Sequence, residues 1–180
     1  MKKLLYILSL VLLITACEQV VFPEPQPRKL KAVSEIPVAL QGTYLDHNQD
    51  TLFVYEHSFS YFTDETSAIE EEFLSDSSVL KMYKSKYFYN KRVLIGNDHY
   101  WLCYILDPVE PGKAFDLYTM DPGDIVKLAK LQEITSKIRD IENGDSDYYL
   151  FAPKKKDYKK IITDTIFTKM ISFRKLSALD

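Results

Sequence analysis

The sequence predicts an α+β fold, in which a mainly antiparallel, curved β-sheet is combined with one long and one short helix. Between residues 42 and 119, short aromatic and β-branched runs alternate with polar turns, which is typical of an antiparallel meander. From residue 121 onward, apolar residues recur every three or four positions, which is the period of a helix. The 180 residues are 46% hydrophobic and 27% charged, a composition that excludes extensive disorder.

The first expected strands are separated by polar turns. We predict strands at 42–46, 51–55, 59–62, 79–83, 87–95, 99–106 and 115–119. The acidic stretch 64–76 is expected to form a short helix or a loop. Residues 96–98, Gly-Asn-Asp, predict a hairpin turn because these residue types tolerate positive φ. Residues 99–106 are apolar or aromatic on both faces, so we expect this strand to be central and covered on both sides.

The long helix is expected to begin at Asp121, a suitable N-cap that Pro122 follows at the first helical position. The helix has one apolar stripe, made of Ile125, Leu128, Leu131, Ile134, Ile138 and Ile141. Asn143-Gly144 favours a left-handed end to this helix. We then predict a strand at 148–151, a short basic helix at 154–162 and a last strand at 167–173.

These elements predict a single globular domain at residues 38–180. We expect its sheet to be lipocalin-like, curving toward a barrel that the two helices cross. The alternative is an open antiparallel sheet with a helix on one face.

The N-terminus predicts export and lipid anchoring. Lys2 and Lys3 precede a mostly apolar run at 4–15, which is too short to span a membrane and has the length of a signal peptide. Residues 14–17, Ile-Thr-Ala-Cys, resemble the lipobox of bacterial lipoproteins. The resemblance implies that residues 1–16 are removed and that Cys17 carries acyl chains, including palmitate. Glu18, rather than Asp, follows the cysteine, so the resemblance favours the outer membrane, facing periplasm or cell surface.

Residues 17–37 are expected to form a tether between the anchor and the domain. Four prolines, Pro23, Pro25, Pro27 and Pro37, lie in this stretch. Alternating proline favours extended polyproline conformation, so we expect the tether to hold the domain away from the bilayer.

The aromatic pattern of the body is similar to that of small uncharacterised lipoproteins of Bacteroidota. The similarity extends over roughly residues 40–175 and rests on YFYN, YWLCYIL, DLYTM, YYLFAP and FTKMISF. It implies no catalytic, cofactor-binding or metal-binding residue.

Several groups of polar residues are candidate sites, and none of them predicts a cofactor or a metal. Asp46, Asn48 and Asp50 resemble the start of a calcium loop, but the later ligand positions do not fit and a hairpin turn is favoured. The three histidines, His47, His57 and His99, supply too few ligands for zinc even beside Cys103. Cys103 lies in an apolar run and is expected to be buried. The lysine cluster at 154–160 and the acidic run at 70–72 are expected to face solvent.

Seven aromatic residues could line the mouth of a barrel and bind an apolar or sugar ligand there. We favour the alternative that they are ordinary residues of the sheet and the core. They are Tyr87, Tyr89, Tyr100, Trp101, Tyr104, Tyr148 and Tyr149.

The leading functional hypothesis is a non-catalytic accessory subunit of a cell-envelope complex, whose partners are the membrane and an envelope protein. Nucleic acid is an unlikely partner for a chain of net charge −3. The alternatives are a lipocalin-like binder of a small ligand and an envelope enzyme without a recognisable motif. A deep apolar cavity would favour the binder, and a filled core would favour the subunit.

Overall fold

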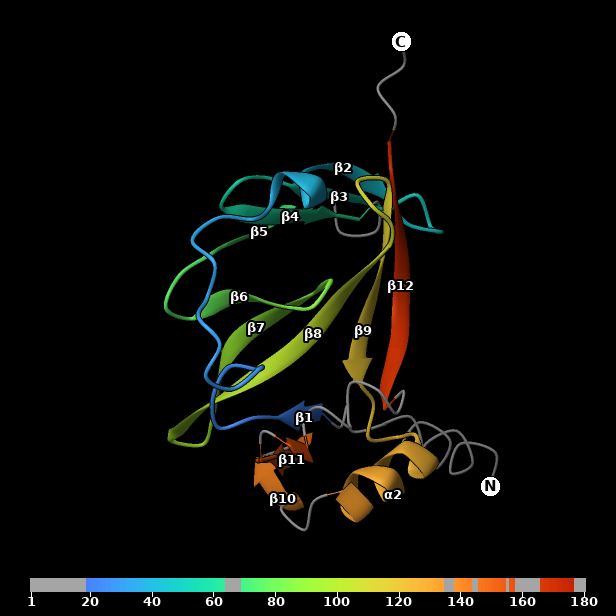
Figure 1. Cartoon of the computed structure of the whole chain (residues 1–180). Helices are drawn as coiled ribbons and strands as arrows, with labels where there is room; N and C mark the ends of the chain where they lie inside the picture. Colours follow the sequence, from blue (N-terminus) through green and yellow to red (C-terminus); the bar gives the residue numbers. More distant parts are fainter. Residues whose placement is uncertain are drawn as a thin grey trace, which may run out of the picture.

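The structure, a computed structural model, describes residues 19–63, 69–134, 138–143, 146–154, 156–157 and 166–176 (Figure 1). Its strands form a nine-stranded sheet with the order β5-β4-β3-β2-β12-β9-β8-β7-β6 and a three-stranded sheet with the order β1-β11-β10. All neighbours in the larger sheet are antiparallel. The predicted α+β class with a mainly antiparallel sheet is confirmed.

The larger sheet contains β2 (Gly42–Leu45), β3 (Thr51–Val54), β4 (Ser58–Phe62), β5 (Ile69–Phe73), β6 (Ser78–Tyr83), β7 (Lys86–Ile95), β8 (Asp98–Glu110), β9 (Ala114–Met120) and β12 (Phe167–Lys175). The smaller sheet contains β1 (Gln19–Val21), β10 (Ile138–Asn143) and β11 (Ser146–Phe151). A short 3-10 helix, η1 (Val38–Leu40), precedes β2. Apart from β1, β5 and β10, these strands lie where the sequence predicts them.

The nine-stranded sheet is strongly curved but open. Figure 1 shows β2–β5 lying across the top of the view, with β12, β9 and β8 running down from them. The rings of Phe59 on β4 and Tyr89 on β7 lie 5.3 Å apart, although five strands separate β4 from β7 in the sheet. The end strands β5 and β6 do not pair with each other. The sheet therefore has a concave inner face, but the expected closure into a barrel is not found among the described strands.

The long helix is shorter than the sequence predicts. α2 spans Ile125–Ile134, whereas Ile138 and Ile141 lie in β10 and pair with β11. Its N-cap is Asp124, whose Oδ1 accepts a hydrogen bond from the Lys127 amide at 3.1 Å. Asp121 instead stabilises the preceding turn through the Gly123 amide. The isoleucine spacing fits a helical stripe, but strand pairing with a distant partner decides the conformation of residues 138–143.

The acidic stretch expected to be a short helix or loop contains a strand. β5 pairs with β4 from Ile69↔Phe62 to Phe73↔Ser58. Two of its carboxylates have partners: Glu71 accepts a hydrogen bond from Ser58, and Glu72 pairs with Lys91 at 2.6 Å. These partners reduce the repulsion that disfavours a strand of consecutive acids. Most of the predicted basic helix at 154–162 lies outside the described residues.

The segment expected to be a free tether is packed against the domain from Gln19 onward. β1 pairs in parallel with β11, and Phe22 exchanges two backbone hydrogen bonds of 2.8 Å with Trp101. Further along, the Gln26 backbone bonds to the buried Asn90 side chain in both directions, each at 2.7 Å. The prolines favour an extended conformation, as expected, but this extended segment makes backbone hydrogen bonds and apolar contacts with the sheet instead of standing free of it.

Lys81 holds the proline-rich part of this segment. Its Nζ donates hydrogen bonds to the carbonyl oxygens of Pro25 at 2.8 Å and Pro27 at 3.2 Å. Burial lowers the pKa of the Lys81 amine from its usual value, against the opposing effect of Glu24. The backbone of Val33 also bonds to Leu80, so residues 19–36 form a strap along the sheet.

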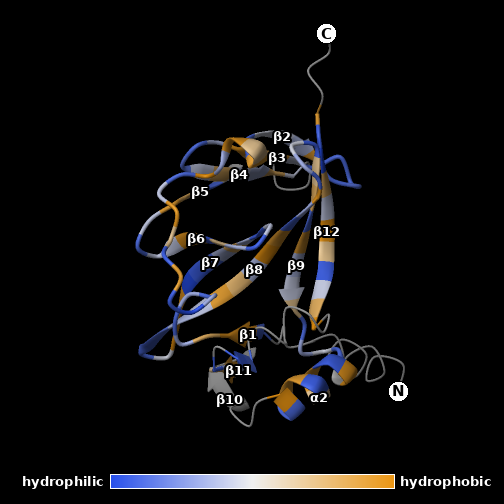
Figure 2. Cartoon of the chain, viewed as in Figure 1, coloured by the Kyte–Doolittle hydropathy of each residue, from blue (hydrophilic) through white to orange (hydrophobic). Residues whose placement is uncertain are grey.

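Figure 2 shows that hydrophobic residues are frequent along β8. Two apolar clusters lie on opposite faces of the central strands, and the successive residues Ile105 and Leu106 of β8 belong to different clusters. The covered cluster lies under the strap, β11 and α2; its buried members are Val20, Phe22, Phe88, Trp101, Cys103, Ile105, Met120, Leu131, Phe151, Ile166 and Phe167. The concave cluster lies on the inner face; its buried members are Ile36, Leu40, Tyr44, Leu52, Val54, Leu80, Leu106, Phe115 and Phe173.

The strand predicted to be covered on both sides is well covered on one. In β8, Trp101, Cys103 and Ile105 are buried in the covered cluster. The alternate residues Tyr100, Leu102 and Tyr104 are only half-buried. β8 is thus apolar on both faces in sequence, but only one of its faces is buried, and the other is partly accessible to solvent.

Candidate functional site: an apolar cavity on the concave face

A cavity of about 380 Å³ lies on the concave face of the nine-stranded sheet. It is lined by Leu52, Phe59, Tyr61, Tyr89, Leu106, Phe115, Leu117, Met170, Ile171 and Phe173. These residues come from six strands, β3, β4, β7, β8, β9 and β12. The cavity therefore exists only because the sheet curls and brings its two ends toward each other.

Strand periodicity explains why these side chains share one face. Successive residues of a strand point to opposite sides of the sheet, so Phe59 and Tyr61 on β4 point inward together. Phe115 and Leu117 on β9 do the same, and Leu117 pairs with the inward-facing Leu106 of β8. Two pairs of these rings pack edge to face: Phe59 with Tyr89, and Tyr61 with Phe173 at 6.2 Å and an interplanar angle of 89°.

A β-bulge in β12 adds Met170 to the lining. Lys169 pairs with Tyr118 and Ile171 with Leu117, so Met170 is an extra residue without a partner on β9. The bulge also reverses the side of the sheet to which the residues after it point. Phe167 is buried in the covered cluster, whereas Ile171 and Phe173 belong to the concave cluster. One strand thereby supplies both clusters, and Met170, 54% exposed, lies at the cavity with its flexible side chain in contact with solvent.

The two hydroxyl groups of the lining already have partners in the protein. Tyr61 donates to Asp46 Oδ2 at 3.0 Å, and the Tyr89 hydroxyl lies 2.9 Å from Ser78 Oγ. Burial, together with the neighbouring Glu72 and Tyr104, raises the pKa of Tyr89 to about 12, although the Ser78 hydrogen bond acts in the opposite direction. Burial and Asp46 also raise the pKa of Tyr61 far above its usual value. Both phenols are therefore neutral at physiological pH, and the described residues that line the cavity include no charged side chain.

The calcium-loop resemblance corresponds to a turn that supports this lining. Asp46 is buried, and its Oδ1 accepts hydrogen bonds from the Asn48 amide at 2.7 Å and the Asp50 amide at 3.0 Å. Its second oxygen accepts the Tyr61 bond. The favoured interpretation, a hairpin turn, is confirmed, and the carboxylate orients a cavity residue.

Of the aromatic residues proposed as a ligand-binding lining, only Tyr89 lines the cavity. Trp101 and Tyr149 belong to the covered cluster. The residues that sequence reasoning missed, such as Leu52, Phe59 and Leu117, carry a weak signal, namely the alternation of apolar and polar residues in the short strands. Nothing in that alternation indicates that distant strands enclose one space.

The other candidate groups lie apart from the cavity. His47, His57 and His99 are exposed, and within the described part of the chain no three metal-ligating side chains come together. Cys103 is buried in the covered cluster, as expected. Lys154 and Lys156 are exposed, whereas Lys155, Lys159, Lys160 and the predicted lipid site Cys17 lie outside the described residues.

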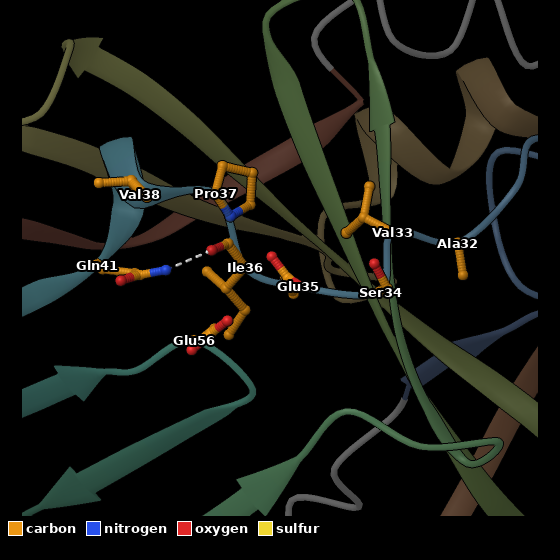
Figure 3. Close-up of a pocket in the computed structure, with 9 residues that line it drawn as sticks. All are labelled: Ala32, Val33, Ser34, Glu35, Ile36, Pro37, Val38, Gln41 and Glu56. Carbon is orange, nitrogen blue, oxygen red and sulfur yellow. Dashed lines mark hydrogen bonds between the residues drawn. The ribbon is translucent and has the colours of Figure 1, made fainter.

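A second hollow is bordered by the end of the strap and is shown in Figure 3. Residues 32–38 line it together with Gln41 and Glu56. The side-chain amide of Gln41 donates a hydrogen bond to the backbone carbonyl of Ile36 at 2.7 Å. The backbone N–H of Ile36 donates to the backbone carbonyl of Glu56, also at 2.7 Å. Its polar groups thus hold the strap to β2 and to the turn before β4, which is a structural role.

No family model matches the chain, and no curated protein and no solved structure matches it significantly. Among the described residues, no helix is both long and apolar enough to cross a membrane. The features of this chain that bear on its function are therefore the cavity and the N-terminal sequence.

Proposed function

We propose that this protein is a lipid-anchored lipoprotein of the bacterial cell envelope that binds a small apolar ligand on the concave face of its sheet. The observation that carries the proposal is the apolar cavity of about 380 Å³, a size within the range of about 300–1,000 Å³ typical of small-molecule sites. The role is one of binding, without catalysis or a cofactor.

The lining defines the chemistry of the ligand. Ten aliphatic, aromatic and thioether side chains surround the space, and their two phenol hydroxyls are bonded to Asp46 and Ser78. A charged group placed among them would lose its hydration without gaining a partner. The part of the ligand inside the cavity is therefore a hydrocarbon, such as an acyl chain, and its affinity comes from removing apolar surface from water.

The proposed anchor supports this proposal, because it would hold the domain close to a source of such ligands. In the proposed mature protein, Cys17 carries the acyl chains and β1 begins two residues later, at Gln19. Two residues extend at most about 7 Å, so the domain lies directly at the surface of the outer membrane. Cys17→Ala should leave an uncut precursor or release the protein from the membrane fraction, and processed protein that stayed there would contradict the anchor.

Ligand binding can be tested by filling the cavity. Residues 18–180, produced without lipid, are titrated with dansyl-labelled undecanoic acid, and dansyl fluorescence is followed. Leu117→Trp places extra volume in the cavity and should weaken binding at least tenfold, whereas Leu94→Trp, at an exposed site 62% open to solvent on β7, should not. The proposal fails if the protein does not bind the probe, or if both variants bind it as the unchanged protein does.

A second candidate is the accessory subunit of an envelope complex, and one observation favours it. β5 ends the nine-stranded sheet, and no strand of the described chain pairs with its outer edge. A strand of a partner protein can add to such an edge through backbone hydrogen bonds. Purification of the tagged, lipidated protein in mild detergent should recover a stoichiometric envelope protein, and replacing Glu71 on this strand by proline should abolish that recovery.

A further inference from the structure

The outer face of β3, β4 and β5 carries a hollow of its own, on the side of the sheet opposite the cavity and distinct from the hollow at residues 32–38. It is about 460 Å³ in volume and is lined by Phe53, Tyr55, Ser58, Ser60 and Glu71. Leu52, Phe59 and Tyr61 alternate with these residues along β3 and β4 and line the cavity instead. The two sites therefore share strands but not side chains.

Two aromatic rings form one wall of this outer hollow. Phe53 and the exposed Tyr55 lie two positions apart on the same face of the chain. Their planes differ by only 7°, with the ring centroids 6.3 Å apart. Parallel rings that keep contact with water offer π faces with negative electrostatic character to a ligand.

The floor of the hollow is polar. Ser58 and Ser60 on β4 are both only 4% exposed, and both line the hollow. Ser58 donates to Glu71 Oε1 at 2.9 Å. The Ser60 hydroxyl makes no hydrogen bond to the described residues, so a nearly buried donor and acceptor is left for a ligand.

We propose that this hollow binds a sugar ring of a carbohydrate. A pyranose has a face of C–H groups, which packs on an aromatic ring, and a rim of hydroxyl groups, which donate and accept hydrogen bonds. The rings of Phe53 and Tyr55 can pack against the C–H face of the sugar. The Ser60 hydroxyl and the Glu71 carboxylate can form hydrogen bonds with the sugar hydroxyls. A hydrocarbon chain would leave the Ser60 hydroxyl without a partner, and an anion would be repelled by Glu71.

The experiment uses residues 18–180 and hexasaccharides of glucose, mannose and N-acetylglucosamine as probes, with isothermal titration calorimetry as the measurement. We expect at least one hexasaccharide to bind. Tyr55→Ala and Ser60→Ala should each weaken that binding at least tenfold. Leu94→Ala, which removes an exposed apolar side chain on β7, should change it less than twofold.

Other outcomes would overturn the inference. The absence of binding by all three probes would do so, as would equal binding by the Tyr55→Ala variant with an unchanged melting temperature. Loss of sugar binding in Leu117→Trp, with binding retained in Tyr55→Ala, would place the sugar in the cavity. Because the sites lie on opposite faces, failure here leaves dansyl-undecanoate binding unaffected, so the two proposals are tested separately.

Discussion

The two faces of the central strands differ in how completely they are covered, although both are apolar in sequence. On the covered face, Phe88 of β7 is fully buried, because Phe22 of the strap, Phe151 of β11 and Leu131 of α2 pack with it in the covered cluster. On the concave face, Tyr61, Tyr89 and Leu117 remain half-buried around the cavity. The covered face is thus shielded by other elements of the chain, whereas the part of the concave face around the cavity stays accessible.

Removal of the strap should have the largest effect on the covered face. A chain of residues 37–180 lacks the buried residues Val20, Val21 and Phe22, and it also lacks Ile36, which is buried in the concave cluster. Each such side chain contributes about 1.5–3 kcal/mol on burial, and the total is comparable with the stability of a typical domain, about 5–15 kcal/mol. We expect residues 37–180 to lack a cooperative thermal transition by circular dichroism, whereas residues 18–180 show one. A stable truncated chain would mean that the covered face needs no strap.

Two single-residue deletions in β12, one at the bulge and one in the regular ladder, should differ in their effect on the free energy of unfolding. Deletion of Thr168, which pairs with Thr119, moves Phe167 to the wrong face of the sheet and should cost several kcal/mol, on the order of a lost core aromatic residue. Deletion of Met170 joins Lys169 directly to Ile171 and leaves a continuous ladder, so it should cost less than about 1 kcal/mol. Urea unfolding measures both changes. Equal costs would show that Met170 is not an extra residue.

A matched pair of isoleucines compares packing on the two faces. Ile105 on β8 is 4% exposed in the covered cluster, and Ile171 on β12 is half-buried at the cavity. Ile105→Ala should lower the free energy of unfolding by about 2–5 kcal/mol, and Ile171→Ala by less than about 2 kcal/mol, because Ile171 already borders open space. Urea denaturation at equal protein concentration gives the two values. A larger loss at Ile171 would indicate that the concave face is as closely packed as the covered one.

The smallest expected effect is a pH dependence that arises on the concave face. The pKa of Tyr89 is about 12 in the folded protein, against 10.0 for a free tyrosine, mainly because of burial. Below pH 10 both states hold the proton and the stabilisation is complete. Between about pH 10 and 12 the unfolded state ionises first, so the stabilisation is lost as the pH rises. The free energy of unfolding should fall more steeply over this range than in Tyr89→Phe, and parallel curves would contradict the assignment.

Part of the fold can be predicted because local pattern and final structure agree. The hairpin of β7 and β8 follows from two apolar runs around Gly96-Asn97-Asp98, and β9, β11 and β12 lie where their sequences favour strands. Prediction fails where two local structures are nearly equal. Ile138 and Ile141 fit both a helix and a strand, and pairing with β11 selects the strand.

The candidate site was the least predictable part. Tyr89 was in the proposed aromatic lining, but Phe59, Leu117 and Ile171 were not, because their proximity depends on strands far apart in the chain. The bulge at Met170 adds a second difficulty, since it changes the face on which later residues lie, and strict alternation cannot anticipate that change.

The sequence by itself determined the class of fold and the position of most strands, because these depend on residues close together in the chain, and residues 1–17 carry the motif on which the proposal of export and lipidation rests. Only the tertiary structure decided that residues 19–27 cover one face and that the sheet curls around a cavity on the other. The physical reason is that both outcomes arise from long-range contacts. Phe22 meets Trp101, Lys81 meets Pro25, and β12 inserts between β2 and β9, and no local propensity encodes those partners.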